Sequence, residues 1–164
     1  MNQEVVRVKT LKTIGQGLEK LVMYLVLLLM AVLVALVFTQ VVLRYVFSSG
    51  MVWVEELDRY LFVWLMFLGI AMGVYKQRHI AITAVADRLK GWAKGIQILV
   101  HIITGSFFAV LCWQGIQFVQ VNMTGTAAVL PINLGIIYSI IPVSGFIALI
   151  FVLVLIASSK EEKQ

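Results

Sequence analysis

The chain has 164 residues, of which 62% are hydrophobic and 13% are charged, whereas soluble domains average about 45–50% apolar and about 25% charged residues. A soluble protein of this size cannot bury that much apolar surface. The net charge of +5 comes from basic residues scattered over polar segments, so we attribute it to membrane topology and exclude a nucleic-acid partner. The single cysteine, Cys112, lies in an apolar stretch, which excludes a disulfide framework and a cysteine metal site.

The first predicted element is a membrane helix over residues 18–46. Residues 21–43 contain no charged residue, and about 20 apolar residues suffice to cross the hydrocarbon core. Basic residues precede this stretch, as in a signal peptide. However, signal peptides have an apolar region of about 7–15 residues followed by a small-residue cleavage site, and this stretch fits neither criterion. We therefore predict a retained first span, followed by a turn at residues 48–50.

A second span is predicted over residues 52–75, and the chain returns to water at residues 76–79. Residues 80–90 then carry apolar side chains at helical spacing, with polar side chains on the other face. This pattern predicts a short amphipathic helix on the membrane surface. Its apolar positions are Ile82, Val85, Ala86 and Leu89.

Two more spans complete the predicted fold, one over residues 92–121 and one over residues 134–157. Pro142 lies inside the last span, where its missing N–H leaves the carbonyl of Tyr138 without a helical partner, so we predict a helix kink. The expected fold is all-α. It is a single membrane domain over residues 1–164, with four transmembrane helices and one interfacial helix.

The distribution of Lys and Arg predicts the orientation. Of the 13 basic residues, 11 lie in the N-terminal segment, the connector between spans two and three, and the C-terminal tail. These segments share one side of the membrane, and the remaining two residues, Arg44 and Arg59, flank the first connector on the other side. Because basic residues stay in the cytoplasm, we expect both termini to be cytoplasmic.

Charged residues gather where the first two spans meet. We call Arg44, Trp53, Glu55, Glu56, Asp58 and Arg59 the hairpin cluster. Glu55 and Arg59 are four residues apart and can pair along a helix, while Arg44 can reach a carboxylate across the hairpin. Three interpretations remain open. The cluster fixes the hairpin by ion pairs, forms a docking surface for an extracytoplasmic partner, or binds a substrate or ion.

The acidic residues argue against a transport site within this chain. None of the eight Asp and Glu residues falls near the middle of a predicted span, whereas ion-coupled transporters usually need a buried ionisable group or a broken helix there. We therefore favour a scaffold subunit over a self-sufficient small four-helix transporter or channel. No catalytic cluster, metal site or cofactor motif is recognisable, so an enzyme is not expected.

Several residues within the spans suggest helix packing. Gly69 and Gly73 form a Gly-x-x-x-Gly step, for which internal and intersubunit contacts are equally favoured. A lone His101 is interpreted as a bonded residue and not as a metal ligand. Three glutamines of the third span lie at a depth similar to Gln40; these are Gln114, Gln117 and Gln120. For them we favour hydrogen bonding between helices over the lining of a transport path.

Several motifs together resemble one family, the small (DctQ-like) membrane subunits of tripartite ATP-independent periplasmic (TRAP) transporters. The most specific motif is Trp53-x-Glu55-Glu56-x-x-Arg59-Tyr60. The others are Arg44-Tyr45-Val46-Phe47, the Gly69 region, His79-Ile80, Leu130-Pro131 and Ile141-Pro142-x-x-Gly145.

This resemblance implies a scaffold subunit in the bacterial inner membrane. It implies two protein partners: a large membrane subunit with the substrate and sodium sites, and a periplasmic substrate-binding protein. The transported compound would be a carboxylate such as sialic acid or a C4-dicarboxylate. The hairpin cluster would lie near the place where the binding protein docks.

Overall fold

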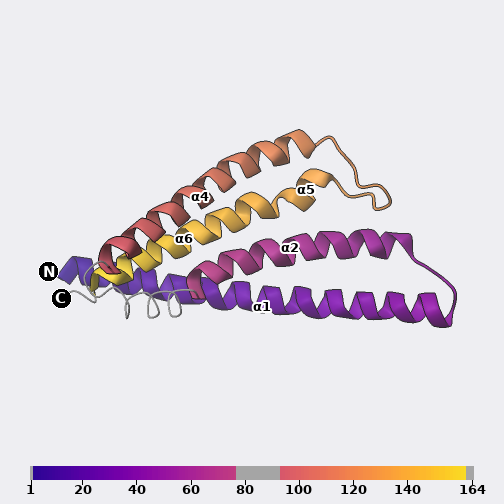
Figure 1. The fold of residues 1–164 in the computed structure, drawn as a ribbon, viewed down its shortest axis with the longest axis horizontal. Helices are drawn as coiled ribbons and strands as arrows, with labels where there is room; N and C mark the ends of the chain where they lie inside the picture. Colours follow the sequence, from indigo (N-terminus) through magenta and orange to yellow (C-terminus); the bar gives the residue numbers. More distant parts are fainter. Residues whose placement is uncertain (1, 77–92, 162–164) are drawn as a thin grey trace.

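The computed structural model describes residues 2–76 and 93–161, and every regular element of this part is a helix (Figure 1). The helices are α1 (Asn2–Val46), α2 (Val52–Lys76), α4 (Ala93–Asn122), α5 (Leu134–Tyr138) and α6 (Ile140–Glu161). Within these described residues, four spans are long and apolar enough to cross a membrane, which confirms the predicted all-α fold. The predicted interfacial helix over residues 80–90 and the His79-Ile80 motif lie outside the described residues.

The helices run back and forth between two ends of the molecule. The first and last described helices both have their terminal ends on one side, while the α1–α2 turn and the α4–α5 loop lie at the opposite side (Figure 1). We call the latter side, formed by residues 47–51 and 123–133 with the adjoining helix ends, the loop end.

Helix α1 is longer than the apolar stretch that predicted it. It begins at Asn2 and not near residue 18, and has 45 residues, or about 68 Å at about 1.5 Å per residue. A Cβ atom on Gly15 would lie 3.0 Å from Val154 Cγ1, so this part of α1 packs closely on α6. The expected start was wrong because a change to polar residues ends a membrane span but does not end a helix.

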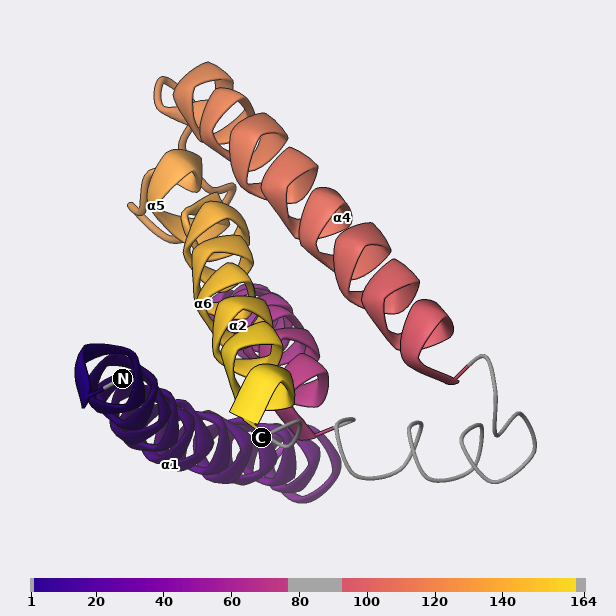
Figure 2. The ribbon, with the colours of Figure 1, turned by 90° about the vertical axis from the view of Figure 1, so that its left-hand side faces the viewer.

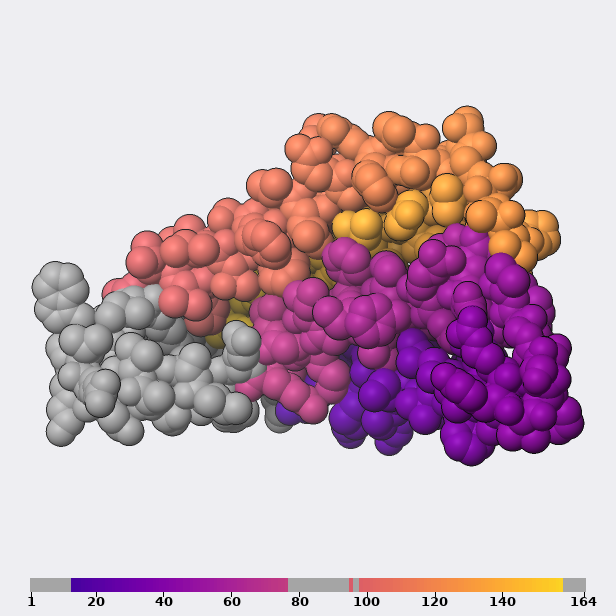
Figure 3. Space-filling model, turned by 45° about the vertical axis from the view of Figure 1, so that its right-hand side comes forward, coloured from indigo at the N-terminus to yellow at the C-terminus, as the bar shows by residue number. Residues whose placement is uncertain are grey.

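Helix α6 forms the centre of the bundle. It packs against α1, α2 and α4, and Figure 3 shows only a narrow strip of it between α2 and α4. Ala148 and Phe151 of α6 are completely buried. Helix α1, in contrast, is the least buried of the four spans, so it lies at the edge of the bundle.

Glycines of the second half of the chain bring α4 and α6 into close contact. A Cβ atom on Gly115 would lie 3.0 Å from both Ile141 Cγ2 and Pro142 N, and one on Gly145 would lie 3.3 Å from Cys112 N. The Cys112 thiol also donates to the Pro142 carbonyl, with 3.7 Å between S and O. Small residues allow membrane helices to approach in this way.

The predicted glycine pair of α2 does not have such an internal role in the described residues. A Cβ atom on Gly69 or Gly73 would meet nothing within 4 Å there. The internal alternative therefore has no support in this part of the chain. Contact with another subunit stays a prediction for this pair.

The fourth span is interrupted at Ser139, between α5 and α6. This position follows Tyr138, whose carbonyl cannot receive a helical hydrogen bond from Pro142. At the interruption itself, the Ser139 hydroxyl donates to the Ile136 carbonyl, with 2.6 Å between the oxygens. The missing N–H of Pro142 accounts for an interruption one turn before the proline itself.

Candidate interaction site at the loop end

Glu56 holds the α4–α5 loop against α2. Its side chain comes from the second turn of α2 and is only 2% exposed. Three consecutive backbone N–H groups donate to this carboxylate: Ala128 to Oε1 at 2.7 Å, Val129 to Oε2 at 2.8 Å and Leu130 to Oε2 at 2.7 Å. Successive N–H groups that converge in this way form an anion-binding nest, and hydrogen bonds to an ionised acceptor are about twice as strong as neutral ones.

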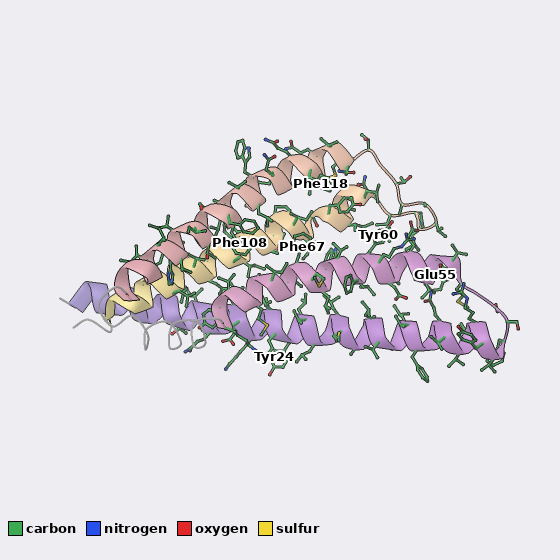
Figure 4. The ribbon with its side chains drawn as sticks, viewed as in Figure 1. Tyr24, Glu55, Tyr60, Phe67, Phe108 and Phe118 are labelled. Atoms are coloured by element: carbon green, nitrogen blue, oxygen red, sulfur yellow. The ribbon has the colours of Figure 1, made fainter. Side chains whose placement is uncertain are left out.

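Two further side chains of α2 extend this attachment. The Tyr60 hydroxyl donates to Glu56 Oε1 at 2.8 Å, from the side of α2 that faces α5 (Figure 4). One turn further on, the Trp64 indole N–H donates to the Ile137 carbonyl of α5 at 2.9 Å. The loop end of α2 is thus bonded both to the loop and to α5.

The α4–α5 loop also has its own internal bonds. Thr126 and Asn133 form an antiparallel bridge, and the Ala127 N–H donates to the Ile132 carbonyl at 2.9 Å. Asn133 caps α5 by accepting from Gly135 N–H at 2.7 Å, and its amide group donates to the Met123 carbonyl. The loop is therefore held in one conformation, with Glu56 at its centre.

Gln40 of α1 stabilises the start of α2 on the other side of the hairpin. With its amide oriented to suit both neighbours, Gln40 Oε1 accepts from Glu55 N–H at 2.9 Å and Nε2 donates to Asp58 Oδ2 at 3.2 Å. The first N–H groups of a helix lack intrahelical partners, and Gln40 supplies one. The second oxygen of Asp58, Oδ1, is buried and has no hydrogen-bond partner in the described part of the chain.

The exposed members of the hairpin cluster form a looser arrangement. Arg44 Nη2 lies 3.9 Å from Glu55 Oε1, with the two side chains 70% and 51% exposed. The predicted Glu55–Arg59 pairing takes another form, because Arg59 Nε donates to the Glu55 backbone carbonyl at 3.4 Å. Trp53 is also exposed, at 44%.

The structure thus divides the hairpin cluster into two groups. Glu56 is a buried structural residue, and Asp58 is partly buried beside Gln40. Arg44, Trp53, Glu55 and Arg59 remain exposed at the loop end, and we call these four the exposed group. Sequence reasoning missed the nest at residues 128–130, since nothing near Glu56 in the sequence identifies a partner about seventy residues away.

The side chains at the surface of the loop end include those of the exposed group. The described residues contain no group of three or more His, Cys, Asp or Glu side chains that could hold a metal ion. The exposed group instead offers charges of both signs and an aromatic ring. Such a combination is typical of a protein-binding surface, in which aromatic and Arg side chains dominate the contact energy.

The predicted residues within the spans have varied surroundings. His101 is partly buried on α4, whereas Gln114, Gln117 and Gln120 are exposed on the same helix. The interhelical hydrogen bonds expected of these three glutamines are not found within the described residues.

The sequence matches known proteins over most of its length. The family model described as tripartite ATP-independent periplasmic transporters, DctQ component, matches residues 33–160. A putative TRAP transporter small permease protein of Haemophilus influenzae is 29% identical over 142 residues, covering 84% of this chain and 86% of that protein.

Two further relatives match shorter segments. The C4-dicarboxylate TRAP transporter small permease protein DctQ of Vibrio cholerae is 24% identical over 98 residues, covering 60% of this chain and 42% of that protein. The isethionate TRAP transporter permease protein DctMQ of Oleidesulfovibrio alaskensis is 26% identical over 100 residues. That match covers 59% of this chain but only 16% of the longer protein.

Proposed function

The chain belongs to the DctQ component family of the tripartite ATP-independent periplasmic (TRAP) transporters, and from this premise we propose a division of labour for it. As the small permease subunit, it supports a large transport subunit in the bacterial inner membrane. Its loop end helps to dock a periplasmic binding protein. The complete system takes up a small organic acid, such as sialic acid or a C4-dicarboxylate, with sodium.

The position of the acidic side chains carries this proposal. The acidic residues of α2, namely Glu55, Glu56 and Asp58, all lie in its first two turns, and α4 contains none. Coupled transport usually requires an ionisable group within the membrane. A subunit without one at mid-span is suited to support a partner that moves the substrate.

The proposed large partner is also supported by the Oleidesulfovibrio relative. In that permease, the segment similar to this chain makes up 16% of the protein. Most of that protein is therefore joined covalently to a unit of the present kind. We infer a comparable association between this chain and a large membrane subunit.

The proposed orientation places the loop end in the periplasm. Most Lys and Arg residues lie toward the ends of the chain or in the connector after α2, and basic residues remain cytoplasmic. The exposed group then faces the compartment of a soluble binding protein. Glu56 and the nest at residues 128–130 hold the neighbouring loop in a fixed shape.

The substrate class rests on the relatives. One is named for C4-dicarboxylates and another for isethionate, which is a sulfonate. Both are small organic anions. We therefore propose a small organic acid for this system, with the particular compound selected by the binding protein and the large subunit.

Reconstitution tests this function. Liposomes that contain this chain, the proposed large subunit and the proposed binding protein should take up the organic acid when sodium is supplied outside. Liposomes with this chain alone should show no uptake above empty vesicles. Uptake by this chain alone would instead establish the alternative of a self-sufficient small transporter or channel.

A further inference from the structure

Helix α4 has one face against the bundle and one face that no other described helix covers. Gly115 lies in close contact with α6, and Phe108 is buried on the same side. Because successive residues turn by about 100° around a helix, Gln117 points almost directly away from α6. Gln114 and Gln120 flank it, three residues before and after. Figure 2 shows α4 at the margin of the bundle, with one side turned away from the other described helices.

The three glutamines differ from several polar side chains of α4 and α1 that have hydrogen-bond partners. Ser106 and Asn122 of α4 donate to backbone carbonyls of their own helix, at Ile103 and Phe118. Gln40 of α1 makes two hydrogen bonds at the start of α2. Gln114, Gln117 and Gln120 are exposed, and none of them has a hydrogen-bond partner among the described residues.

Lipid alone is a poor environment for this face. Gln114 is eight residues from Asn122, the last residue of α4, which is about 12 Å along the axis at about 1.5 Å per residue. Hydrocarbon offers no hydrogen bonds, and a glutamine side chain is too short to reach water as a lysine does. The middle of α1 presents no such problem, since its exposed residues between positions 25 and 38, including Leu27, Leu28 and Phe38, are apolar.

We propose that the outer face of α4, through Gln114, Gln117 and Gln120, binds a transmembrane helix of the large transport subunit. The inference rests on the proposed function and identifies the surface that function requires. The complementary helix carries hydrogen-bonding side chains or exposed carbonyls, because an amide both donates and accepts. Polar side chains that bond across helices are a recurrent feature of membrane interfaces.

The large subunit is favoured over a second copy of this chain. In the Oleidesulfovibrio relative, a segment similar to this chain is joined to a much longer remainder, so a large membrane partner is available beside each such unit. Association of two copies of this chain through their α4 faces is one outcome of the test below.

A photo-crosslinking amino acid tests the surface directly. It is placed at Gln114, at Gln117 and, as a matched control, at Phe38 of α1. Phe38 is 68% exposed and lies eight residues from Val46, the loop-end terminus of α1. In membranes that contain the complete system, we expect adducts with the large subunit from positions 114 and 117 and none from position 38.

The other crosslinking results overturn the inference in distinguishable ways. Adducts of twice the chain's mass would show self-association through α4. Adducts with the large subunit from position 38 alone would place the interface on α1. Absence of any adduct, together with failure of the two subunits to copurify, would contradict the proposed function itself.

Substitution by leucine provides a second measurement. Gln114→Leu and Gln117→Leu should each lower the affinity for the large subunit by about threefold, the effect of one average interhelical hydrogen bond in a membrane. The isolated subunit should melt at the same or a higher temperature, because an unpartnered amide is lost from its surface. Gln40→Leu, the control, should lower the melting temperature of the isolated subunit. Unchanged affinity in the Gln114→Leu/Gln117→Leu double variant would overturn the inference.

Discussion

At the scale of single residues, the loop end depends on the contrast between two carboxylates of one helix. Glu56 accepts four hydrogen bonds, three from the backbone and one from Tyr60. Asp58, two residues later, has one oxygen bonded to Gln40 and one with no partner in the described residues. Both oxygens of the Glu56 carboxylate are thus hydrogen-bonded, whereas only one oxygen of the Asp58 carboxylate is. The two residues can therefore be compared by the same substitution.

Replacing each carboxylate by an amide should separate these roles. Glu56→Gln puts an NH₂ group where a backbone N–H already donates, so we expect the melting temperature of the purified subunit to fall by several degrees. Asp58→Asn removes a charge whose second oxygen has no partner, and should change the melting temperature little. Equal effects of the two substitutions would show that the nest around Glu56 does not stabilise the fold.

The Arg44–Glu55 pair provides a test of docking that is independent of stability. Exposed ion pairs contribute less than about 1 kcal/mol, so Glu55→Arg should hardly change the melting temperature. It should weaken binding of the periplasmic protein and alter the dependence of that binding on salt, if the exposed group forms part of the docking surface.

The charge-swapped double variant, Arg44→Glu with Glu55→Arg, discriminates further. It restores an internal pair but exchanges the two charges that a partner would meet. Restored binding would therefore assign the pair to hairpin geometry, whereas persistently weak binding supports docking. The affinity is measured by titrating the binding protein onto the reconstituted complex.

At the scale of elements, the decisive contact is the approach of α4 to α6 around Gly115 and Gly145. Here one helix backbone lies against the other at the position of Pro142, where the ring and the neighbouring backbone cannot move aside easily. The Gly-x-x-x-Gly step at Gly69 and Gly73, which has the more familiar spacing, has open space around it in the described residues. Spacing alone therefore did not distinguish the glycines that pack from those that do not.

Alanine substitutions at the two kinds of glycine should have opposite signs. Gly115→Ala puts a methyl group 3.0 Å from Pro142 N, and overpacking of this kind costs about 1–3 kcal/mol. Gly69→Ala meets no neighbour and improves helix propensity by up to about 1 kcal/mol. Thermal unfolding of the isolated subunit in detergent measures both, and destabilisation by Gly69→Ala would contradict this assignment.

At the scale of the whole molecule, the outer ends of α1 and α6 lie at one end and two bonded connections lie at the other (Figure 1). The proposed function requires the loop end to face the periplasm. Together with the further inference, it gives the subunit two binding surfaces, the loop end for the binding protein and the outer face of α4 for the large subunit. These surfaces adjoin at the end of α4, so one small subunit can contact both partners.

Cysteine labelling tests this orientation. In a Cys112→Ala background, Thr124→Cys at the loop end should react with a membrane-impermeant maleimide in intact spheroplasts. Lys76→Cys, at the opposite end of α2, should react only after permeabilisation. Both side chains are exposed, so a difference in reactivity reports the side of the membrane. The reverse pattern would place the termini in the periplasm and remove the basis for docking at the loop end.

Local pattern was sufficient for some features of this protein and insufficient for others. The runs of apolar residues predicted four membrane helices, because the length and polarity of a span depend only on neighbouring residues and on the thickness of the bilayer. The start of α1 was placed too late, since a helix continues through polar residues that have adequate helix propensity. Pro142 predicted a kink in the fourth span, because its missing N–H can be read from that residue alone. The structure places the interruption at Ser139, three residues earlier.

The sequence by itself therefore determined that this protein lies in a membrane, that it is helical and, through short motifs, which family it belongs to. Only the tertiary structure decided that Glu56 is a buried anchor, that Gly115 and not Gly69 lies at a helix contact, and that three glutamines of α4 face away from the bundle. Each of these depends on groups far apart in the chain; the Glu56 carboxylate and the Ala128 amide, for example, are 72 residues apart. Such pairings follow from how the helices pack, which local composition does not specify.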